Sequence, residues 1–137
     1  MKRLVFLTVS LFFLVGSLAF AQDVKYRLSS HILDITQGSP ASGVSIRLSK
    51  LDENKDWVTI DEKITDKYGR IKDFLKEDGT DHIGIYKLTY FTLPYFERQN
   101  QLSFYPFIEV VFEIKDDSHY HVPITLSPYG YSTYRGN

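Results

Sequence analysis

The chain has 137 residues, of which 43% are hydrophobic, 15% aromatic and 24% charged, a composition typical of one folded domain. Its formal net charge of −1 argues against a nucleic-acid partner bound through phosphate contacts. The absence of cysteine excludes a disulfide scaffold, a thiolate zinc site, an iron–sulfur cluster and cysteine nucleophilic catalysis.

The first 21 residues have the features of a secretory signal peptide. Two basic residues precede an apolar run over residues 4–20, and Ala19 and Ala21 supply the small side chains that a signal peptidase requires. We therefore expect cleavage after Ala21; the alternative is an uncleaved membrane anchor, since the run is almost long enough to span a bilayer. Cleavage leaves residues 22–137 as one domain of 116 residues with a net charge of −3. No further apolar run follows, which predicts a soluble protein without membrane attachment, exported to the periplasm.

Hydrophobic residues in the remaining chain alternate with polar ones, a period that is typical of strands with one buried face. Val44, Ile46 and Leu48, for example, are separated by Ser45 and Arg47. Turn-forming sequences separate such runs. We expect about eight strands, near residues 26–35, 43–50, 57–65, 69–74, 84–92, 107–115, 120–127 and 129–134.

Residues 94–100 do not alternate, and they begin with Pro94, which suits the first turn of a helix. We therefore expect one short helix between the fifth and sixth strands. Many short strands at this spacing predict an all-β fold, a two-sheet antiparallel sandwich of about eight strands with one short helix.

Three of the four histidines lie in positions that suggest chemistry. His119 and His121 are two residues apart on a predicted strand, so both point to one face. Val122 lies on the other face, which is apolar. His31 lies on the first predicted strand, whereas His82 lies in a predicted loop where a solvated histidine is expected. A histidine on an outer face is either a solvated surface residue or an acid–base group near neutral pH. Together, three imidazoles would also suit a zinc ion, although no nearby carboxylate is placed to support them.

Arg70 and the end of the chain are two further candidates. Arg70 follows Gly69 at the start of a strand, as either a solvated turn residue or a planar donor for a substrate carbonyl or anion. Residues 129–137 stay aromatic almost to the end, which predicts a tail that is tied down, with a structural or substrate-facing role. The sequence contains no nucleophile elbow, phosphate-binding glycine loop or dinucleotide fingerprint, which favours a mechanism without a covalent intermediate.

Several segments resemble the signatures of the transthyretin-related 5-hydroxyisourate hydrolases, a family of urate breakdown. Residues 119–136, HYHVPITLSPYGYSTYRG, resemble the C-terminal signature. Residues 28–34, LSSHILD, resemble the N-terminal signature, and residues 65–71, TDKYGRI, resemble the central one. The resemblance covers essentially all of residues 22–137. The C-terminal motif also separates the hydrolases from transthyretin itself, which keeps neither the histidine pair nor the Tyr-Arg-Gly ending.

The resemblance implies hydrolysis of 5-hydroxyisourate to 2-oxo-4-hydroxy-4-carboxy-5-ureidoimidazoline, with no metal or organic cofactor. The family's catalytic residues fall on His31, Arg70 and His121. Its substrate contacts fall on His31 and Arg70 together with Tyr134 and Arg135. The resemblance also implies a transthyretin-like sandwich that forms a homotetramer, a dimer of dimers with sites in a channel where the dimers meet.

Two positions depart from the family pattern: Asn137 stands where serine is usual, and Thr125 stands where leucine is usual. We expect Asn137 to cost little activity, and Thr125 to tune substrate fit or a subunit interface. The main alternative function is a non-catalytic, transthyretin-like carrier of small aromatic ligands. A secreted sandwich used for adhesion or scaffolding, and a zinc hydrolase, are weaker alternatives.

Overall fold

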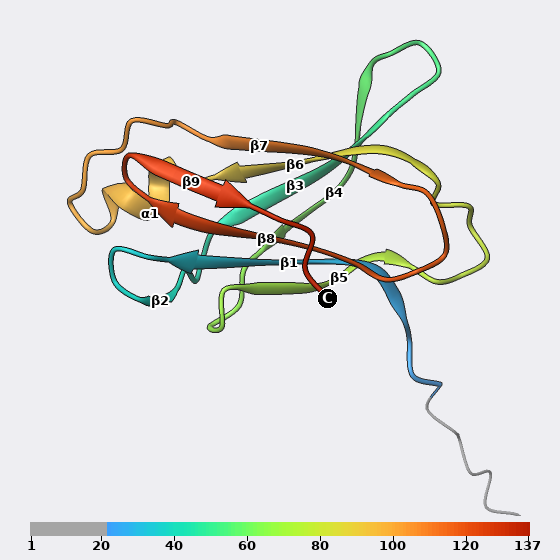
Figure 1. The fold of residues 1–137 in the computed structure, drawn as a ribbon, viewed down its shortest axis with the longest axis horizontal. Coiled ribbons are helices and arrows are strands. Elements are labelled where there is room, and N and C mark those ends of the chain that lie inside the picture. The colour runs from blue at the N-terminus through green and yellow to red at the C-terminus, as the bar shows by residue number, and fades with distance from the viewer. Residues whose placement is uncertain (1–21) are drawn as a thin grey trace, which may run out of the picture.

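The protein, described here over residues 22–137 in a computed structural model, consists of two stacked β-sheets and one short helix (Figure 1). The elements in chain order are β1 (Tyr26–Asp34), β2 (Ser39–Pro40), β3 (Ser45–Leu51), β4 (Trp57–Ile64), β5 (Arg70–Lys76), β6 (Gly84–Phe91), α1 (Leu93–Glu97), β7 (Ile108–Ile114), β8 (Tyr120–Ser127) and β9 (Gly130–Thr133). One sheet has the order β2-β1-β8-β9, with β5 also paired to β1, and the other has the order β4-β3-β6-β7. The predicted signal peptide, residues 1–21, lies outside the described residues. No helix within residues 22–137 has the length and apolar character needed to cross a membrane.

The predicted two-sheet sandwich with one short helix is confirmed, with three differences in detail. A ninth strand, β2, contains only two residues. Helix α1 begins at Leu93 and ends at Glu97, and the chain then turns to reach Asn100, whose φ of +54° is incompatible with a continuing helix. Strand β1 pairs with β8 in parallel, so the sandwich is not antiparallel throughout. Alternation identifies the buried face of a strand but carries no information about the direction of its neighbour.

The core lies between the two sheets, where alternate side chains of facing strands meet. Its largest fully buried side chains are Leu28, Ile32, Ile46, Leu48, Phe74, Tyr86, Leu88, Tyr90, Phe96, Ile108, Ile114 and Ile124. Strand β4 departs from this pattern, since Val58, Ile60 and Ile64 are 46%, 46% and 68% exposed. The alternation of β4 predicted a half-buried apolar face, and this was wrong because Lys63 and Asp61, rather than Ile64, are the register partners of the buried Ile46 and Leu48. The β3–β4 hairpin also extends beyond the opposite sheet (Figure 1).

A buried hydrogen-bond network connects the two sheets through β1. The Ser30 hydroxyl donates to the Val122 carbonyl of β8 at 2.8 Å and lies 2.9 Å from the hydroxyl of Tyr90 on β6. All three residues are buried, so these groups have lost water and depend on one another for hydrogen bonds. The network therefore holds β1 against β8 in one register, which fixes the relative positions of the residues on their outer face.

A second buried contact joins the helix to β1 and supports a stability prediction. The Tyr95 hydroxyl of α1 donates to Asp34 Oδ2 at 2.7 Å, while Asp34 Oδ1 accepts the backbone N–H groups of Thr36 and Gln37. We expect Tyr95→Phe to lower the free energy of unfolding by about 1–3 kcal/mol, because it leaves a buried carboxylate oxygen without its donor. Urea denaturation followed by circular dichroism measures this effect. The control is Tyr129→Phe at a position that is 70% exposed; equal midpoints for the two variants would contradict the prediction.

Candidate active site

Strand pairing brings three of the predicted site residues onto the outer face of the five-stranded sheet. His31 of β1 lies directly opposite Arg70 of β5 in the antiparallel register. On its other side, β1 pairs with β8, where Ser29 is the register partner of His121. The half-buried His31 alternates with the buried Ile32, so the histidine points away from the core. His121 is the diagonal neighbour of His31 on this face, and its pKa responds to the charges of Arg70 and His31, so His31, Arg70 and His121 form one cluster.

Arg70 is held opposite His31 by a tight turn. The Asp66 carboxylate accepts the backbone N–H groups of Tyr68 at 2.8 Å and Arg70 at 2.9 Å. Between them, Gly69 has a φ of +69°, and a Cβ at this position would lie 2.6 Å from the carbonyl oxygen of Ile32. Only glycine combines this conformation with so close an approach to β1. The glycine before Arg70 therefore has the turn and close-approach role that the sequence predicts.

His121 is flanked by the end of the chain. The N–H of Gly136 donates to the His121 carbonyl at 2.9 Å, and the two residues form an isolated antiparallel bridge. A Cβ at Gly136 would overlap the ring atom Cδ2 of His121. The tail is thus tied down, as its aromatic composition predicts, and its backbone packs against the imidazole.

On the other side of His121, Ser29 connects it to His119. Ser29 Oγ lies 2.8 Å from Nδ1 of His121 and 2.8 Å from Nε2 of His119. His119 Nδ1 in turn lies 2.9 Å from the carbonyl oxygen of Tyr26. Ser29 was not among the predicted site residues. Its position two residues before His31, on the same face of the same strand, is the signal that would have found it.

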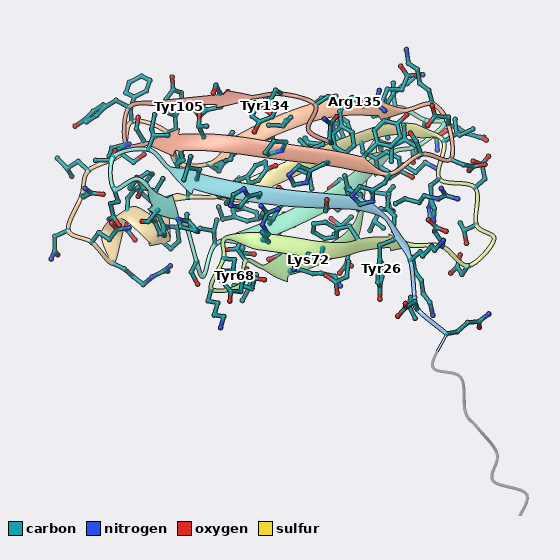
Figure 2. The ribbon with its side chains drawn as sticks, turned by 60° about the horizontal axis from the view of Figure 1, so that its bottom comes forward. Tyr26, Tyr68, Lys72, Tyr105, Tyr134 and Arg135 are labelled. Atoms are coloured by element: carbon teal, nitrogen blue, oxygen red, sulfur yellow. The ribbon has the colours of Figure 1, made fainter. Side chains whose placement is uncertain are left out.

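Tyr134 and Arg135 lie on a different side of the molecule from the β5 edge. Figure 2 shows both near β7 and β9, opposite the edge that carries Tyr68 and Lys72. The Arg135 guanidinium lies 4.6 Å above the ring of Tyr120, a cation–π contact. Tyr134 and Arg135 line a cavity of about 400 Å³ together with His121. His121 is therefore the group shared by this cavity and the His31–Arg70 cluster, whereas His31 and Arg70 do not line the cavity.

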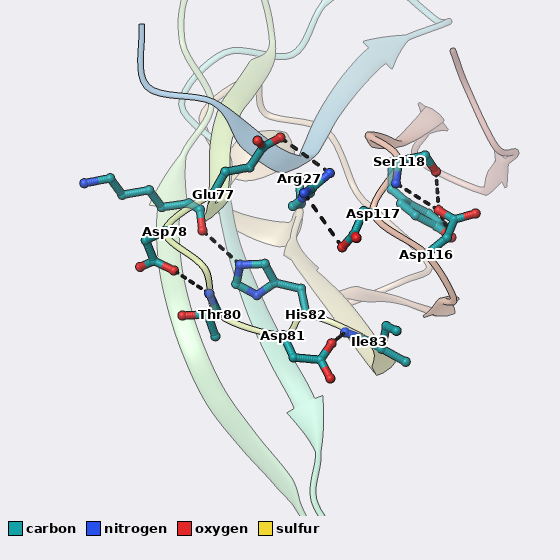
Figure 3. A network of polar contacts seen from close by, with 12 residues as sticks. Arg27, Glu77, Asp78, Thr80, Asp81, His82, Ile83, Asp116, Asp117 and Ser118 are labelled. Atoms are coloured by element: carbon teal, nitrogen blue, oxygen red, sulfur yellow. Dashed lines mark hydrogen bonds and ion pairs between the residues drawn. The ribbon is translucent and has the colours of Figure 1, made fainter. Parts of the chain in front are cut away.

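The remaining histidine, His82, lies in a separate polar network (Figure 3). Its Nε2 atom lies 2.9 Å from the Lys76 carbonyl, so the ring fastens the loop after β5. Nearby, Arg27 forms long ion pairs with Glu77 at 3.6 Å and with Asp117 at 3.7 Å. Exposed pairs of this kind contribute little to stability. These contacts explain the loop structure and leave His82 outside the cluster.

Burial and neighbouring positive charge both lower the pKa of the two histidines in the cluster. Burial lowers the pKa of His31 below 6.5, and the Arg70 charge lowers it further. Burial also lowers the pKa of His121, with further contributions from Arg70 and His31. A neutral imidazole next to a fixed guanidinium can accept a proton from a bound water while the guanidinium stabilises negative charge.

The same pKa shifts give a testable expectation. In an NMR titration, we expect the ring protons of His31 and His121 to titrate below pH 6.5. Arg70→Gln should move both midpoints to higher pH, because removal of a neighbouring positive charge makes protonation of the rings less costly. Lys67→Gln removes an exposed charge that is not a cause of either shift and should leave the midpoints in place. Midpoints at or above 6.5 in the unmodified protein would contradict the electrostatic description.

The zinc alternative finds no support in this geometry. Within residues 22–137, no three histidine, cysteine or acidic side chains converge in an arrangement that could hold a metal ion. Both ring nitrogens of His119 are already engaged, one by Tyr26 and the other by Ser29.

The architecture defines a transthyretin-like β-sandwich whose outer face carries a cluster of two histidines and an arginine. Residues 28–136 match the HIUase/Transthyretin family, and the chain belongs to this family. It is 51% identical over 111 residues to a probable 5-hydroxyisourate hydrolase of Caenorhabditis elegans, covering 80% of this chain and 81% of that protein.

Two solved structures are similar in fold. The 5-hydroxyisourate hydrolase of Klebsiella pneumoniae is 38% identical with a TM-score of 0.68, covering 80% of this chain and 98% of the other. Sea bream transthyretin in complex with thyroxine is 29% identical with a TM-score of 0.75, covering 80% and 94% of the respective chains.

Proposed function

We propose that this protein hydrolyses 5-hydroxyisourate to 2-oxo-4-hydroxy-4-carboxy-5-ureidoimidazoline in the breakdown of urate. The observation that carries the proposal is the cluster of His31, Arg70 and His121, in which burial and the Arg70 charge lower the pKa of both imidazoles. Relatives that bear the name 5-hydroxyisourate hydrolase, in Caenorhabditis elegans and Klebsiella pneumoniae, support the choice of substrate.

In the proposed reaction, water adds to the acyl carbon of a carbon–nitrogen bond in the six-membered ring. His121 and His31 position the water, and one imidazole takes its proton as the new carbon–oxygen bond forms. Arg70 binds the substrate and stabilises the oxyanion of the tetrahedral intermediate. The intermediate collapses when the carbon–nitrogen bond breaks, and the imidazolium returns its proton to the leaving nitrogen. The ring is thereby opened with no covalent bond to the protein.

Tyr134 and Arg135 are proposed to orient the flat substrate ring. Both line the cavity that also includes His121, so a ring held by the cluster at His121 would extend toward them. Tyr134 is 61% exposed, which leaves its ring free to pack against a planar ligand.

We propose that the working form is a homotetramer, a dimer of dimers. Strands β7 and β9 end their sheets within residues 22–137, and they expose Val111 and Tyr131. Unpaired edges with apolar side chains suit association with a second copy, and further pairing over the cluster face would exclude water from it. Light scattering coupled to size-exclusion chromatography measures the mass directly; a monomer at micromolar concentration would contradict this proposal.

The carrier alternative rests on one observation, the similarity in fold to sea bream transthyretin in complex with thyroxine, and the named hydrolase relatives do not favour it. One assay separates the two functions. Urate oxidase generates 5-hydroxyisourate from urate in the cuvette, and its ultraviolet absorbance is followed with and without the purified protein. Accelerated decay that His121→Ala abolishes supports the hydrolase. Decay at the spontaneous rate with a folded protein would overturn it and favour the carrier.

Export to the periplasm is also a proposal, based on the signal peptide features of residues 1–21. N-terminal sequencing of the protein from the exported fraction tests it. A chain that begins at Gln22 is the expected result, and a chain in the cytoplasmic fraction that retains residues 1–21 would contradict it.

A further inference from the structure

The hydrogen bonds around His119 determine where its proton lies. His119 Nδ1 lies 2.9 Å from the backbone carbonyl oxygen of Tyr26. A carbonyl oxygen can only accept, so Nδ1 is the donor and carries hydrogen. In the neutral ring the other nitrogen, Nε2, then holds a lone pair, and this atom lies 2.8 Å from Ser29 Oγ.

The direction of the Ser29 hydrogen bonds then determines which ring nitrogen of His121 carries hydrogen. A hydroxyl has one hydrogen to donate, and Ser29 Oγ has two ring-nitrogen neighbours, Nε2 of His119 and Nδ1 of His121, each at 2.8 Å. Because Nε2 of His119 holds a lone pair, Ser29 donates its hydrogen there. Its remaining hydrogen bond, to His121, is one that Ser29 must accept. Nδ1 of His121 therefore carries hydrogen.

The series of hydrogen bonds from Tyr26 to His121 leaves Nε2 of His121 as the atom that can accept a proton. With hydrogen on Nδ1, a neutral His121 has its lone pair on Nε2, and no group within residues 22–137 hydrogen-bonds that atom. The reverse order, with Nε2 of His119 protonated, would make Ser29 the donor to His121. It would place hydrogen on Nε2 of His121, which could then no longer take a proton from water.

We propose that His119 is a positioning residue that acts through Ser29 to hold His121 in the tautomer whose Nε2 atom accepts the proton of the attacking water. The proposal rests on the hydrolase function for its catalytic consequence, whereas the tautomer itself is independent of any activity. It also selects His121 over His31 as the general base, a choice that neither the sequence nor the electrostatics makes.

The backbone makes this arrangement rigid. Ser29 and His121 are register partners in the parallel ladder of β1 and β8, so their separation is set by strand pairing rather than by a loop. The titratable and charged groups whose interactions shift the pKa of His121 are His31 on β1, Arg70 on β5 and His119 before β8, and Gly136 of the tail packs against the ring. Among these neighbours, only His119 reaches His121 through a hydrogen-bonded side chain.

Nitrogen-15 NMR of the histidine-labelled protein tests the tautomer directly, since protonated and unprotonated ring nitrogens have well-separated chemical shifts. At a pH where the ring is neutral, we expect hydrogen on Nδ1 and a bare Nε2 for His121. Ser29→Ala and His119→Leu should increase the fraction of His121 that carries hydrogen on Nε2, because each removes a hydrogen bond of the series that fixes the tautomer. Ser29→Thr and His119→Gln keep the hydroxyl and the acceptor and should restore the original tautomer.

Kinetics supply the second measurement. Ser29→Ala and His119→Leu should each lower kcat by about tenfold, because His121 molecules with hydrogen on Nε2 cannot act as the base. KM should not change, and the restoring variants should recover kcat. Ser45→Ala, a matched serine-to-alanine change on the four-stranded sheet, should alter neither quantity.

The outcomes are distinct. Hydrogen on Nε2 of His121 in the unmodified protein would overturn the proposal, as would an unchanged tautomer and kcat in folded Ser29→Ala. The expected tautomer and its response to the variants, in a protein without hydrolase activity, would support the positioning role while rejecting the proposed function.

Discussion

Replacement of His121 by alanine should lower kcat/KM for 5-hydroxyisourate by about 10²–10⁴, the contribution of a positioned general base. The ring occupies the centre of the site. Its Nδ1 atom lies 2.8 Å from Ser29 Oγ on one side, the ring packs against Gly136 on another, and it borders the cavity that Tyr134 also lines. Its lowered pKa keeps it in the basic form at neutral pH. No other group in the cluster combines these properties.

The ultraviolet assay with in situ urate oxidase measures this loss. His82→Ala is the matched control, because His82 fastens a loop outside the cluster and should retain full kcat/KM. Thermal unfolding of both variants verifies that the fold is intact. A loss of less than about tenfold in folded His121→Ala would reject His121 as the base.

Replacement of Arg70 by alanine should lower kcat/KM by about 10²–10³, the range for removal of one group that stabilises an oxyanion. The kcat/KM of Arg70→Lys should lie between those of the unmodified protein and Arg70→Ala, since lysine keeps the charge but lacks the planar donor pair. The measurement must be made at high pH, where His31 and His121 are neutral in every variant. At lower pH, the raised histidine pKa values in Arg70→Ala would leave more of the histidines protonated and lower kcat/KM for a second reason.

Arg47→Ala is the matched control for the arginine. Arg47 lies on the four-stranded sheet, where its Nε donates to Glu62 at 2.8 Å, so its removal should leave kcat/KM unchanged. If Arg70→Ala and Arg47→Ala have the same activity, Arg70 has no role in the reaction. If Arg70→Ala raises KM and leaves kcat unchanged, its role is substrate binding alone.

The fold was largely predictable because alternation reports burial directly. The outward position of His121 follows from the apolar residues on either side of it, and the structure confirms that Tyr120 and Val122 are buried. Alternation was misleading for Ile64, which pairs with Ser45 on the outer face of the four-stranded sheet and is 68% exposed. The parallel direction of β1 beside β8 was also hidden, because these strands are separated in sequence by the whole second sheet.

The residues of the site were predictable, but the strand register and the hydrogen bonds that bring them together were not. The sequence and the family resemblance single out His31, Arg70 and His121. The opposition of His31 and Arg70 depends on register, which a period of two leaves undetermined by itself. The link from His119 through Ser29 joins residues 90 positions apart, and the stacking of Arg135 on Tyr120 arises only after the tail has folded back.

The alternation along β1 and β8 has a consequence for how such a protein can change over evolutionary time. On both strands, residues that face the core and residues that form the cluster occupy alternate positions, as with Ile32 next to His31 and Val122 next to His121. Substitutions at the outer positions can therefore remove or alter chemistry while the packing that stabilises the sandwich stays intact. One architecture can then pass between unrelated roles by single substitutions, without an unstable intermediate.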